Sequence, residues 1–218
     1  MYDRSASRWH ASISRLGYLT AYTNLFERLV IDRQLPVFDR QARVLDAGIG
    51  SGALSLALAE TVGARFQLDG VDLAPRMLQE AQLRLNTAGV SATLHQRRIE
   101  ALPFAADRFD AVLSSHALEH VTDLSAAIGE LVRVLRPGAP MMLVLSRPGP
   151  ATAWLRLRWG AATYMTGVIL GAMGDAGLVE HRLYPFTSGI AQHWSCAYVG
   201  RKVHGERLRV SLGAWSRQ

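Results

Sequence analysis

A glycine-rich turn between a short apolar strand and a helix is the feature that most narrows the folds open to this chain. Residues 42–47, ARVLDA, have the apolar character of a buried strand. Gly48, Gly50 and Gly52 follow at alternate positions, and a helical pattern then runs to Val62. Such glycines let the backbone adopt positive φ and approach a ligand, while the free N–H groups of the helix start point at it.

The same alternation of strand and helix continues along the chain. Repeated strand–helix units imply a parallel sheet with helices on both faces. The last two strands are close enough in sequence to be antiparallel neighbours. We therefore expect an α/β, Rossmann-like fold whose seven-stranded sheet is mostly parallel with an antiparallel last strand. The further strands are expected at 66–72, 91–96, 109–114, 140–146, 179–186 and 194–200, and the further helices from Pro75, over about 122–135 and up to Gly177.

A segment of about forty residues precedes this pattern. Trp9, Ile13, Leu16, Phe26 and Val30 recur there at helical spacing. They predict either a helix that packs on the sheet or a lid over a site at the carboxyl ends of the strands. The expected organisation is an N-terminal helical segment or lid over residues 1–40, a ligand-binding domain over 41–200, and a basic tail over 201–218.

Composition excludes several classes of protein. The single cysteine, Cys196, rules out a disulfide framework, and no signal peptide or membrane span is predicted, so we expect a cytoplasmic protein. The formal charge is +6, but the tail from Arg201 to Gln218 holds five basic residues and one acidic residue, which accounts for +4 of it. The remaining chain lacks a basic stripe with interleaved aromatic residues, so no nucleic-acid partner is expected.

Two acidic residues indicate what the glycine turn holds. Asp46 lies at the end of the first strand, where a carboxylate would repel a pyrophosphate and attract an amino group or a sulfonium. This disfavours a dinucleotide reductase. Asp72 ends the second strand, where a carboxylate suits hydrogen bonds to ribose hydroxyls. A cationic amino-acid moiety joined to a ribose describes S-adenosylmethionine.

From residue 40 to residue 146 the sequence resembles class I S-adenosylmethionine-dependent methyltransferases, in particular the group around ubiquinone and menaquinone biosynthesis. The resemblance rests on VLDAGIGSG, GVDLAPRML, IEALPFAADRFDAVLSSHALEHV and RVLRPGAPMMLVLS. It implies a cofactor site whose methionine portion is surrounded by Asp46, Gly48, Gly50 and Gly52 and whose ribose is bound by Asp72. The resemblance also implies that Leu73 and Met77 flank the adenine and that Ile99 and Glu100 lie at its edge. Ser114 and Ser115 would lie beneath the sulfonium.

Two points in this pattern stay open. Leu73 and Met77 are also explained by ordinary core packing. Arg97 and Arg98 stand where the family often has Gly-Asp, and arginine cannot accept a hydrogen bond from the adenine amino group. That amino group would then bond to Glu100, to a backbone carbonyl or to water.

Two histidines are candidate bases for methyl transfer. His116 follows the fourth strand, at the rim where an acceptor would approach, and imidazole titrates near neutrality. His193 lies between the last two strands. His116, Glu119 and His120 also match an H-x-x-E-H zinc pattern, but no third ligand is evident, so no metal is expected. A purely structural role for His116 remains an alternative.

The acceptor is only broadly indicated. The segment 148–166 interleaves Trp154 and Trp159 with arginines, which suits an aromatic wall, contact with a membrane surface, or an amphipathic connecting helix. A small, lipophilic or aromatic acceptor is therefore expected. The alternatives are a phospholipid or amine N-methyltransferase, an RNA methyltransferase, and a catalytically silent S-adenosylmethionine-binding protein. Neither the methylated atom nor the oligomeric state is predicted.

Overall fold

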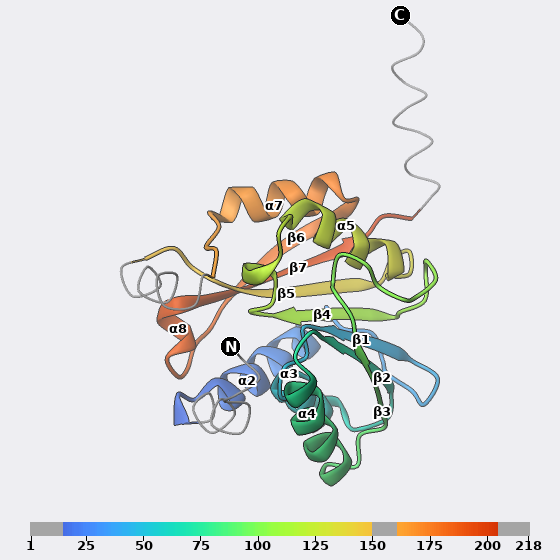
Figure 1. Ribbon diagram of the computed structural model, residues 1–218. Helices are drawn as coiled ribbons and strands as arrows, with labels where there is room; N and C mark the ends of the chain where they lie inside the picture. Colours follow the sequence, from blue (N-terminus) through green and yellow to red (C-terminus); the bar gives the residue numbers. More distant parts are fainter. Residues whose placement is uncertain (1–14, 150–160, 205–218) are drawn as a thin grey trace, which may run out of the picture.

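The computed structural model describes residues 15–149 and 161–204. Seven strands form one sheet in the order β3-β2-β1-β4-β5-β7-β6 (Figure 1). Strands β1 to β5 are mutually parallel, and β7 runs antiparallel to both of its neighbours. The predicted fold class is confirmed. The strands span Arg43–Ala47 (β1), Gln67–Asp72 (β2), Ala92–Gln96 (β3), Ala111–Ser115 (β4), Pro140–Ser146 (β5), Leu178–Pro185 (β6) and Ser195–Lys202 (β7).

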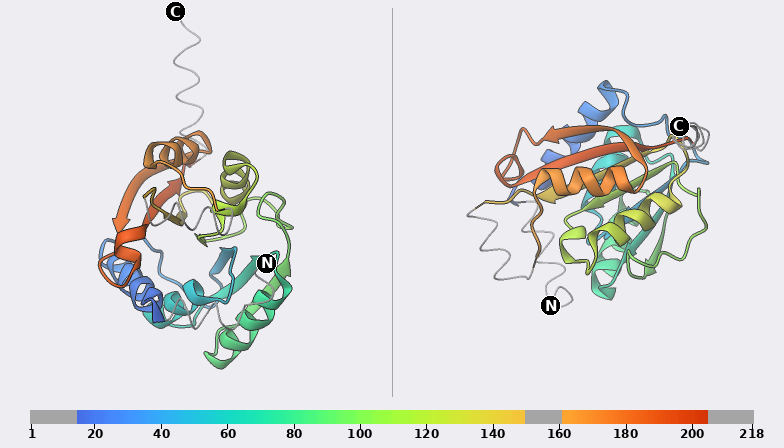
Figure 2. Two further views of the ribbon diagram at one scale, coloured as in Figure 1. Left: turned by 60° about the vertical axis from the view of Figure 1, so that its left-hand side comes forward. Right: turned by 90° about the horizontal axis from the view of Figure 1, so that it is seen from above.

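Helices cover both faces of the sheet. One apolar cluster joins the sheet to α2 (Tyr18–Ile31), α3 (Ala53–Val62) and α4 (Pro75–Thr87). The other joins it to α5 (Leu124–Val134) and α7 (Thr166–Asp175). In the left view of Figure 2 the orange α7 and yellow-green α5 lie together on the opposite side from the blue α2. Strand β5 is buried along its whole length, as expected of a strand between two covered faces.

Most predicted boundaries agree with the structure within about two residues. One difference is the connection before β7, where a short helix, α8 (Ala191–Trp194), follows the predicted turn. Another is the predicted helix over about 122–135, which begins at Leu124 because Asp123 caps it by accepting a hydrogen bond from the Ala126 N–H at 3.0 Å. A 3₁₀ turn, η2 (Leu118–His120), precedes this cap.

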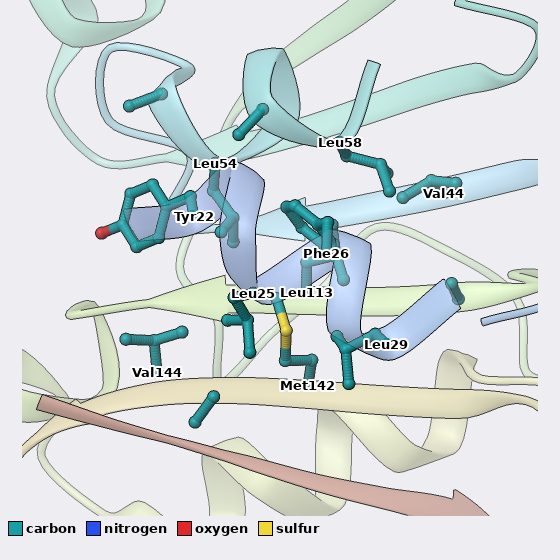
Figure 3. Close-up of a cluster of buried hydrophobic side chains, with 14 of the residues drawn as sticks. Tyr22, Leu25, Phe26, Leu29, Val44, Leu54, Leu58, Leu113, Met142 and Val144 are labelled. Carbon is teal, nitrogen blue, oxygen red and sulfur yellow. The ribbon is translucent and has the colours of Figure 1, made fainter. Parts of the chain in front are cut away.

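Helix α2 is the part of the N-terminal segment that the structure describes. Its Leu25, Phe26 and Leu29 are buried against the sheet (Figure 3). Its start is bonded to the β6–α8 connection, where Ile190 donates its N–H to the Leu16 carbonyl at 3.1 Å. The helix therefore packs on the sheet; closure as a lid stays a prediction. Trp9 and Ile13 lie outside the described residues.

Lys202, the single lysine of the chain, closes the carboxyl end of α5. Its Nζ donates to the carbonyls of Val132 and Leu135, both at 2.8 Å, and to the Asp107 carboxylate at 2.7 Å. The last carbonyls of a helix have no partner within the helix, and a lysine can satisfy them.

We expect Lys202→Met to lower the free energy of unfolding by ~1.5–3 kcal/mol, the typical range for a hydrogen bond to a charged group. Urea unfolding followed by circular dichroism measures this. The control is Arg84→Met, which removes a partly exposed ion pair with Glu80 within α4 and should change stability by less than ~0.5 kcal/mol. Equal effects of the two substitutions would contradict a capping role for Lys202.

Candidate active site

A cavity of about 410 Å³ opens at the carboxyl ends of β1, β2 and β4, beside the start of α2. This size is within the range usual for small-molecule sites. Of the residues expected from the sequence, it is lined by Asp46, Gly48, Gly50, Asp72, Leu73, Met77, Ile99, Glu100, Ser115 and His116. Ligands in open α/β sheets bind at this edge, where parallel strands end together.

The turn after β1 requires glycine for two separate reasons. Gly48 has φ +78°, in the left-handed region that side-chain-bearing residues rarely adopt. A Cβ at this position would also lie 2.1 Å from the Cβ of Ala117. The backbone N–H groups of Gly48 and Ile49 both donate to the Val71 carbonyl, at 2.7 and 3.0 Å, so the turn is fixed against β2.

We expect Gly48→Ala to lower both stability and ligand affinity, because the new methyl group must displace the segment after β4. Adding Ala117→Gly removes the clash but leaves the backbone strain, so the double variant should recover only part of the stability. Thermal unfolding of the wild type, the two single variants and the double variant measures this coupling. Additive effects of the two substitutions would contradict the predicted contact.

Asp72 connects the glycine turn to the start of α4. Its Oδ2 accepts a hydrogen bond from the Gly50 N–H at 2.8 Å, and its Oδ1 accepts one from the Ala74 N–H at 2.9 Å. Burial raises the pKa of this carboxyl above its usual value, against the opposing effect of these backbone donors. Each carboxylate oxygen can accept further bonds, so Asp72 can also receive hydroxyl donors from a ligand in the cavity.

Asp46 is the most deeply buried acid of the cavity, with 1% of its surface exposed. Its Oδ2 accepts a hydrogen bond from the Ser55 hydroxyl at 2.6 Å. The pKa of Asp46 is raised to about 7, because burial and, to a smaller extent, the charge of Asp72 raise it more than the Ser55 bond lowers it. A cationic ligand group beside these two carboxylates would stabilise the ionised form of Asp46.

The residues predicted beside an adenine lie along one side of the cavity. Met77 and Ile99 are buried, whereas Leu73 is 56% exposed and therefore lies at the rim, not in the core. The Glu100 carboxylate accepts from Arg98 at 2.8 Å. Burial acts to raise the pKa of Glu100, but its own backbone N–H, Thr122 and Arg98 outweigh that effect and lower it.

His116 follows β4, which lies on the other side of β1 from β2, and its φ is +54°. Its Nδ1 is 3.0 Å from the Glu119 carboxylate, and its Nε2 is 3.4 Å from the Ser195 hydroxyl. Glu119 is buried and also accepts the Ser146 N–H at 2.6 Å. Burial acts to raise the pKa of Glu119, but the charge and hydrogen bond of His116 and the bonds from Ser146 lower it below its usual value.

Two tyrosines of α2 complete this side of the cavity. The Tyr22 hydroxyl is 2.8 Å from that of Ser115, and the Tyr18 hydroxyl is 3.3 Å from that of Ser195. The Tyr18 and His116 rings meet edge to face, with centroids 5.6 Å apart. Burial raises the pKa of both phenols, which keeps them neutral. Sequence reasoning named neither tyrosine, although both lie on the helix predicted to cover the site.

Three expected site residues do not line the cavity. Ser114 is buried and donates its hydroxyl to the Ala47 carbonyl at 2.7 Å. Gly52 has φ +80°, and a Cβ there would lie 3.6 Å from both Ala81 and Leu85 of α4. His193 is exposed on α8, and its neighbour Trp194 lines the cavity instead.

The H-x-x-E-H pattern does not form the helical pair that a zinc site of this kind requires. His116 follows a strand, and His120 ends the 3₁₀ turn η2, so the two histidines do not share one α-helical face. Within residues 15–149 and 161–204, no group of three His, Cys, Asp or Glu side chains is arranged to hold a metal. In the same ranges, no helix has the length and apolar character needed to cross a membrane.

Comparison with known proteins gives one consistent family. Residues 44–138 match a model described as a methyltransferase domain. The demethylmenaquinone methyltransferase of Thermus thermophilus is 34% identical over 176 residues, which is 79% of this chain and 80% of that protein. An uncharacterized Mycobacterium tuberculosis protein is 32% identical over 177 residues, which cover 72% of this chain but only 64% of that protein.

Solved structures share the fold. The geranyl diphosphate C-methyltransferase of Streptomyces coelicolor, in complex with S-adenosyl-L-homocysteine, has a TM-score of 0.68 and 16% identity, covering 81% of this chain and 76% of that one. A SAM-dependent methyltransferase of Aquifex aeolicus has a TM-score of 0.63 and 17% identity, covering 81% and 89%. At these identities the likeness concerns the fold alone.

Proposed function

Because this chain belongs to the family of S-adenosylmethionine-dependent methyltransferases, we propose that it moves a methyl group from S-adenosylmethionine onto a small, apolar acceptor. The observation that carries the proposal is that two chemically different sets of residues line one cavity. Asp46, Asp72 and the glycine turn form the first side; aromatic rings, with His116 and its partner Glu119, form the second.

The first side suits the cofactor. Asp46 would face its ammonium group, and Asp72 would accept from its ribose hydroxyls while holding the Gly50 N–H. Both carboxylates are hydrogen-bond acceptors when ionised, which matches a ligand whose amino-acid and ribose ends are donors. Met77 and Ile99 would flank the adenine. When bound, the cofactor supplies an activated methyl group, so the protein need contribute mainly alignment and exclusion of water.

The second side suits an apolar, aromatic acceptor. Leu16, Tyr18, Tyr22, Ala161 and Trp194 line it, from parts of the chain that are far apart in sequence. Aromatic and aliphatic walls with few polar groups select flat apolar ligands. Relatives named as quinone-biosynthesis methyltransferases support an acceptor of this kind. Leu16, Tyr18 and Tyr22 come from the N-terminal segment, and we propose that this segment acts as a lid over the cavity.

Transfer of a labelled methyl group tests the function. The protein is incubated with S-adenosylmethionine labelled on its methyl carbon and a panel of apolar hydroxyaromatic compounds, first ranked by thermal shift in the presence of S-adenosylhomocysteine. Label is expected in the organic extract, and not in added RNA. Binding of S-adenosylhomocysteine without transfer to any acceptor would favour a silent binding protein, and label in RNA would overturn the proposed acceptor class.

A further inference from the structure

We propose that Glu119 positions His116 as the base that removes a proton from a phenol-like hydroxyl of the acceptor, and that this oxygen receives the methyl group. The inference rests on the proposed function and adds two things to it. It names the chemical class of the acceptor, and it assigns a role to a buried carboxylate that cofactor binding does not use.

Glu119 determines which ring nitrogen of His116 carries the proton. Glu119 has 6% of its surface exposed, and its Oε1 accepts the Ser146 N–H at 2.6 Å. The depressed pKa of Glu119 keeps it ionised, and an ionised carboxylate can only accept hydrogen bonds. The Nδ1 of His116, 3.0 Å away, therefore carries the proton. In the neutral ring this leaves the lone pair on Nε2.

The other ring nitrogen of His116, Nε2, lies 3.4 Å from the Ser195 hydroxyl, and this hydroxyl is 3.3 Å from that of Tyr18. His116 lines the cavity with 22% of its side chain exposed, and we place the acceptor hydroxyl beside its Nε2. The titratable groups that face the imidazole are Glu119 and His120 of η2 and Tyr18 of α2.

The backbone of His116 is a separate observation in favour of a functional role. Its φ of +54° is unusual for a residue with a side chain and costs of order 1–3 kcal/mol. The His116 N–H donates to the Val144 carbonyl at 2.9 Å, which fixes this conformation at the end of β4. Strain of this kind clusters at functional sites; Arg33, Asp107 and Glu180 share the positive φ, but only His116 of the four lines the cavity.

The proposed transfer needs no reactant beyond the acceptor, the cofactor, His116 and Glu119. The hydroxyl proton moves to Nε2, and the resulting imidazolium is paired with Glu119. The oxygen lone pair forms the new O–CH₃ bond as the S–CH₃ bond of the cofactor breaks, and that electron pair stays on sulfur. The proton then leaves Nε2 for water. Pairing with an ionised carboxylate stabilises the imidazolium that forms beside a cationic cofactor.

A matched pair of probes separates a hydroxyl from an amine acceptor. 2-Naphthol and 2-naphthylamine have the same ring system, but the amine attacks with a free lone pair and needs no prior loss of a proton. The proteins compared are the wild type, Glu119→Gln, His116→Gln and His95→Gln. His95 is the control because it forms a similar pair with Asp69, at 2.8 Å, away from the cavity.

We expect the wild type to methylate 2-naphthol in preference to 2-naphthylamine. His116→Gln should lower kcat for 2-naphthol by ~10²–10⁴-fold and remove the acidic limb of the kcat/KM profile. Glu119→Gln should lower kcat by ~10–100-fold and leave the KM for S-adenosylmethionine nearly unchanged, because a neutral amide does not stabilise the imidazolium that forms during the transfer. His95→Gln should stay within about twofold of the wild type.

Two further measurements separate this inference from failure of folding or of the proposed function. Calorimetric titration with S-adenosylhomocysteine should give the same affinity for all four proteins. Long-range ¹H–¹⁵N spectra should show the His116 proton on Nδ1 in the wild type. If the wild type does not bind S-adenosylhomocysteine, the proposed function fails and this inference fails with it. If binding is normal, the inference alone is overturned by preference for 2-naphthylamine, by no transfer to 2-naphthol, or by a kcat of Glu119→Gln equal to that of the wild type.

Discussion

Replacing Asp72 with alanine is expected to weaken binding of S-adenosylhomocysteine by ~100-fold, which corresponds to ~2.7 kcal/mol. Two effects add. The ligand loses the acceptor for its ribose hydroxyls, and hydrogen bonds to a charged acceptor are worth ~1.5–3 kcal/mol each. The glycine turn also loses the bond from the Gly50 N–H at 2.8 Å, so the backbone that faces the ligand is less firmly held. Isothermal titration calorimetry measures the change.

Asp110 provides the matched control for this substitution. Its carboxylate also accepts a backbone N–H, that of Arg43 at 2.8 Å. Arg43 begins β1, so Asp110 lies at the opposite end of this strand from the cavity. Asp110→Ala should therefore lower stability without changing affinity. Asp72→Asn, which keeps one carbonyl oxygen, should have an intermediate affinity. Unchanged affinity in Asp72→Ala would contradict the assigned ribose contact.

Asp46→Asn is expected to stabilise the protein and to weaken cofactor binding at the same time. A folded-state pKa of about 7 is higher than the ~3.9 of an unfolded aspartate, so between about pH 4 and pH 7 the folded protein binds more protons than the unfolded chain. Stability therefore falls as pH rises through this window. The amide carries no charge, still accepts the Ser55 hydroxyl, and should melt several degrees higher than the wild type at pH 8.

The ligand affinity of Asp46→Asn should fall by at least ~10-fold, or ~1.4 kcal/mol, because the ammonium group loses its counter-charge. In the wild type, affinity should be constant above about pH 7 and fall by up to ~10-fold per pH unit below it, as Asp46 becomes protonated. The variant should show no such dependence. The control is Glu60→Gln, an exposed acid on α3. A wild-type affinity that does not change between pH 5.5 and 8 would contradict this role for Asp46.

Much of the fold and of the carboxylate side of the cavity could be predicted from the sequence. Asp46 and Asp72 lie at the ends of two strands, and parallel strands that alternate with helices end at one edge of a sheet. The neighbouring serines show where such reasoning stops. Successive residues of a strand point to opposite faces, and sequence alone did not show which face of β4 the cavity meets. Ser115 lines the cavity, whereas Ser114 bonds to Ala47 in the core.

The acceptor side was less predictable because it depends on contacts between distant segments. The spacing of His116 and Glu119 did not reveal their contact, because the chain forms a 3₁₀ turn there, and the N–H of Ser146 on β5 helps to fix the carboxylate. Tyr22 reaches Ser115 across 93 positions of sequence. No local pattern encodes such pairs. Similarly, the short helix α8 leaves His193 exposed, while the next residue, Trp194, lines the cavity.

The most direct measurement is a competitive calorimetric titration of the wild-type protein with S-adenosylhomocysteine and with NADH at pH 7.5. One molecule of S-adenosylhomocysteine per chain should bind, with an affinity lowered by Asp72→Ala, and NADH should neither bind nor compete. Binding of NADH in place of S-adenosylhomocysteine, or no binding of either, would contradict the assignment of this cavity to a cationic nucleoside.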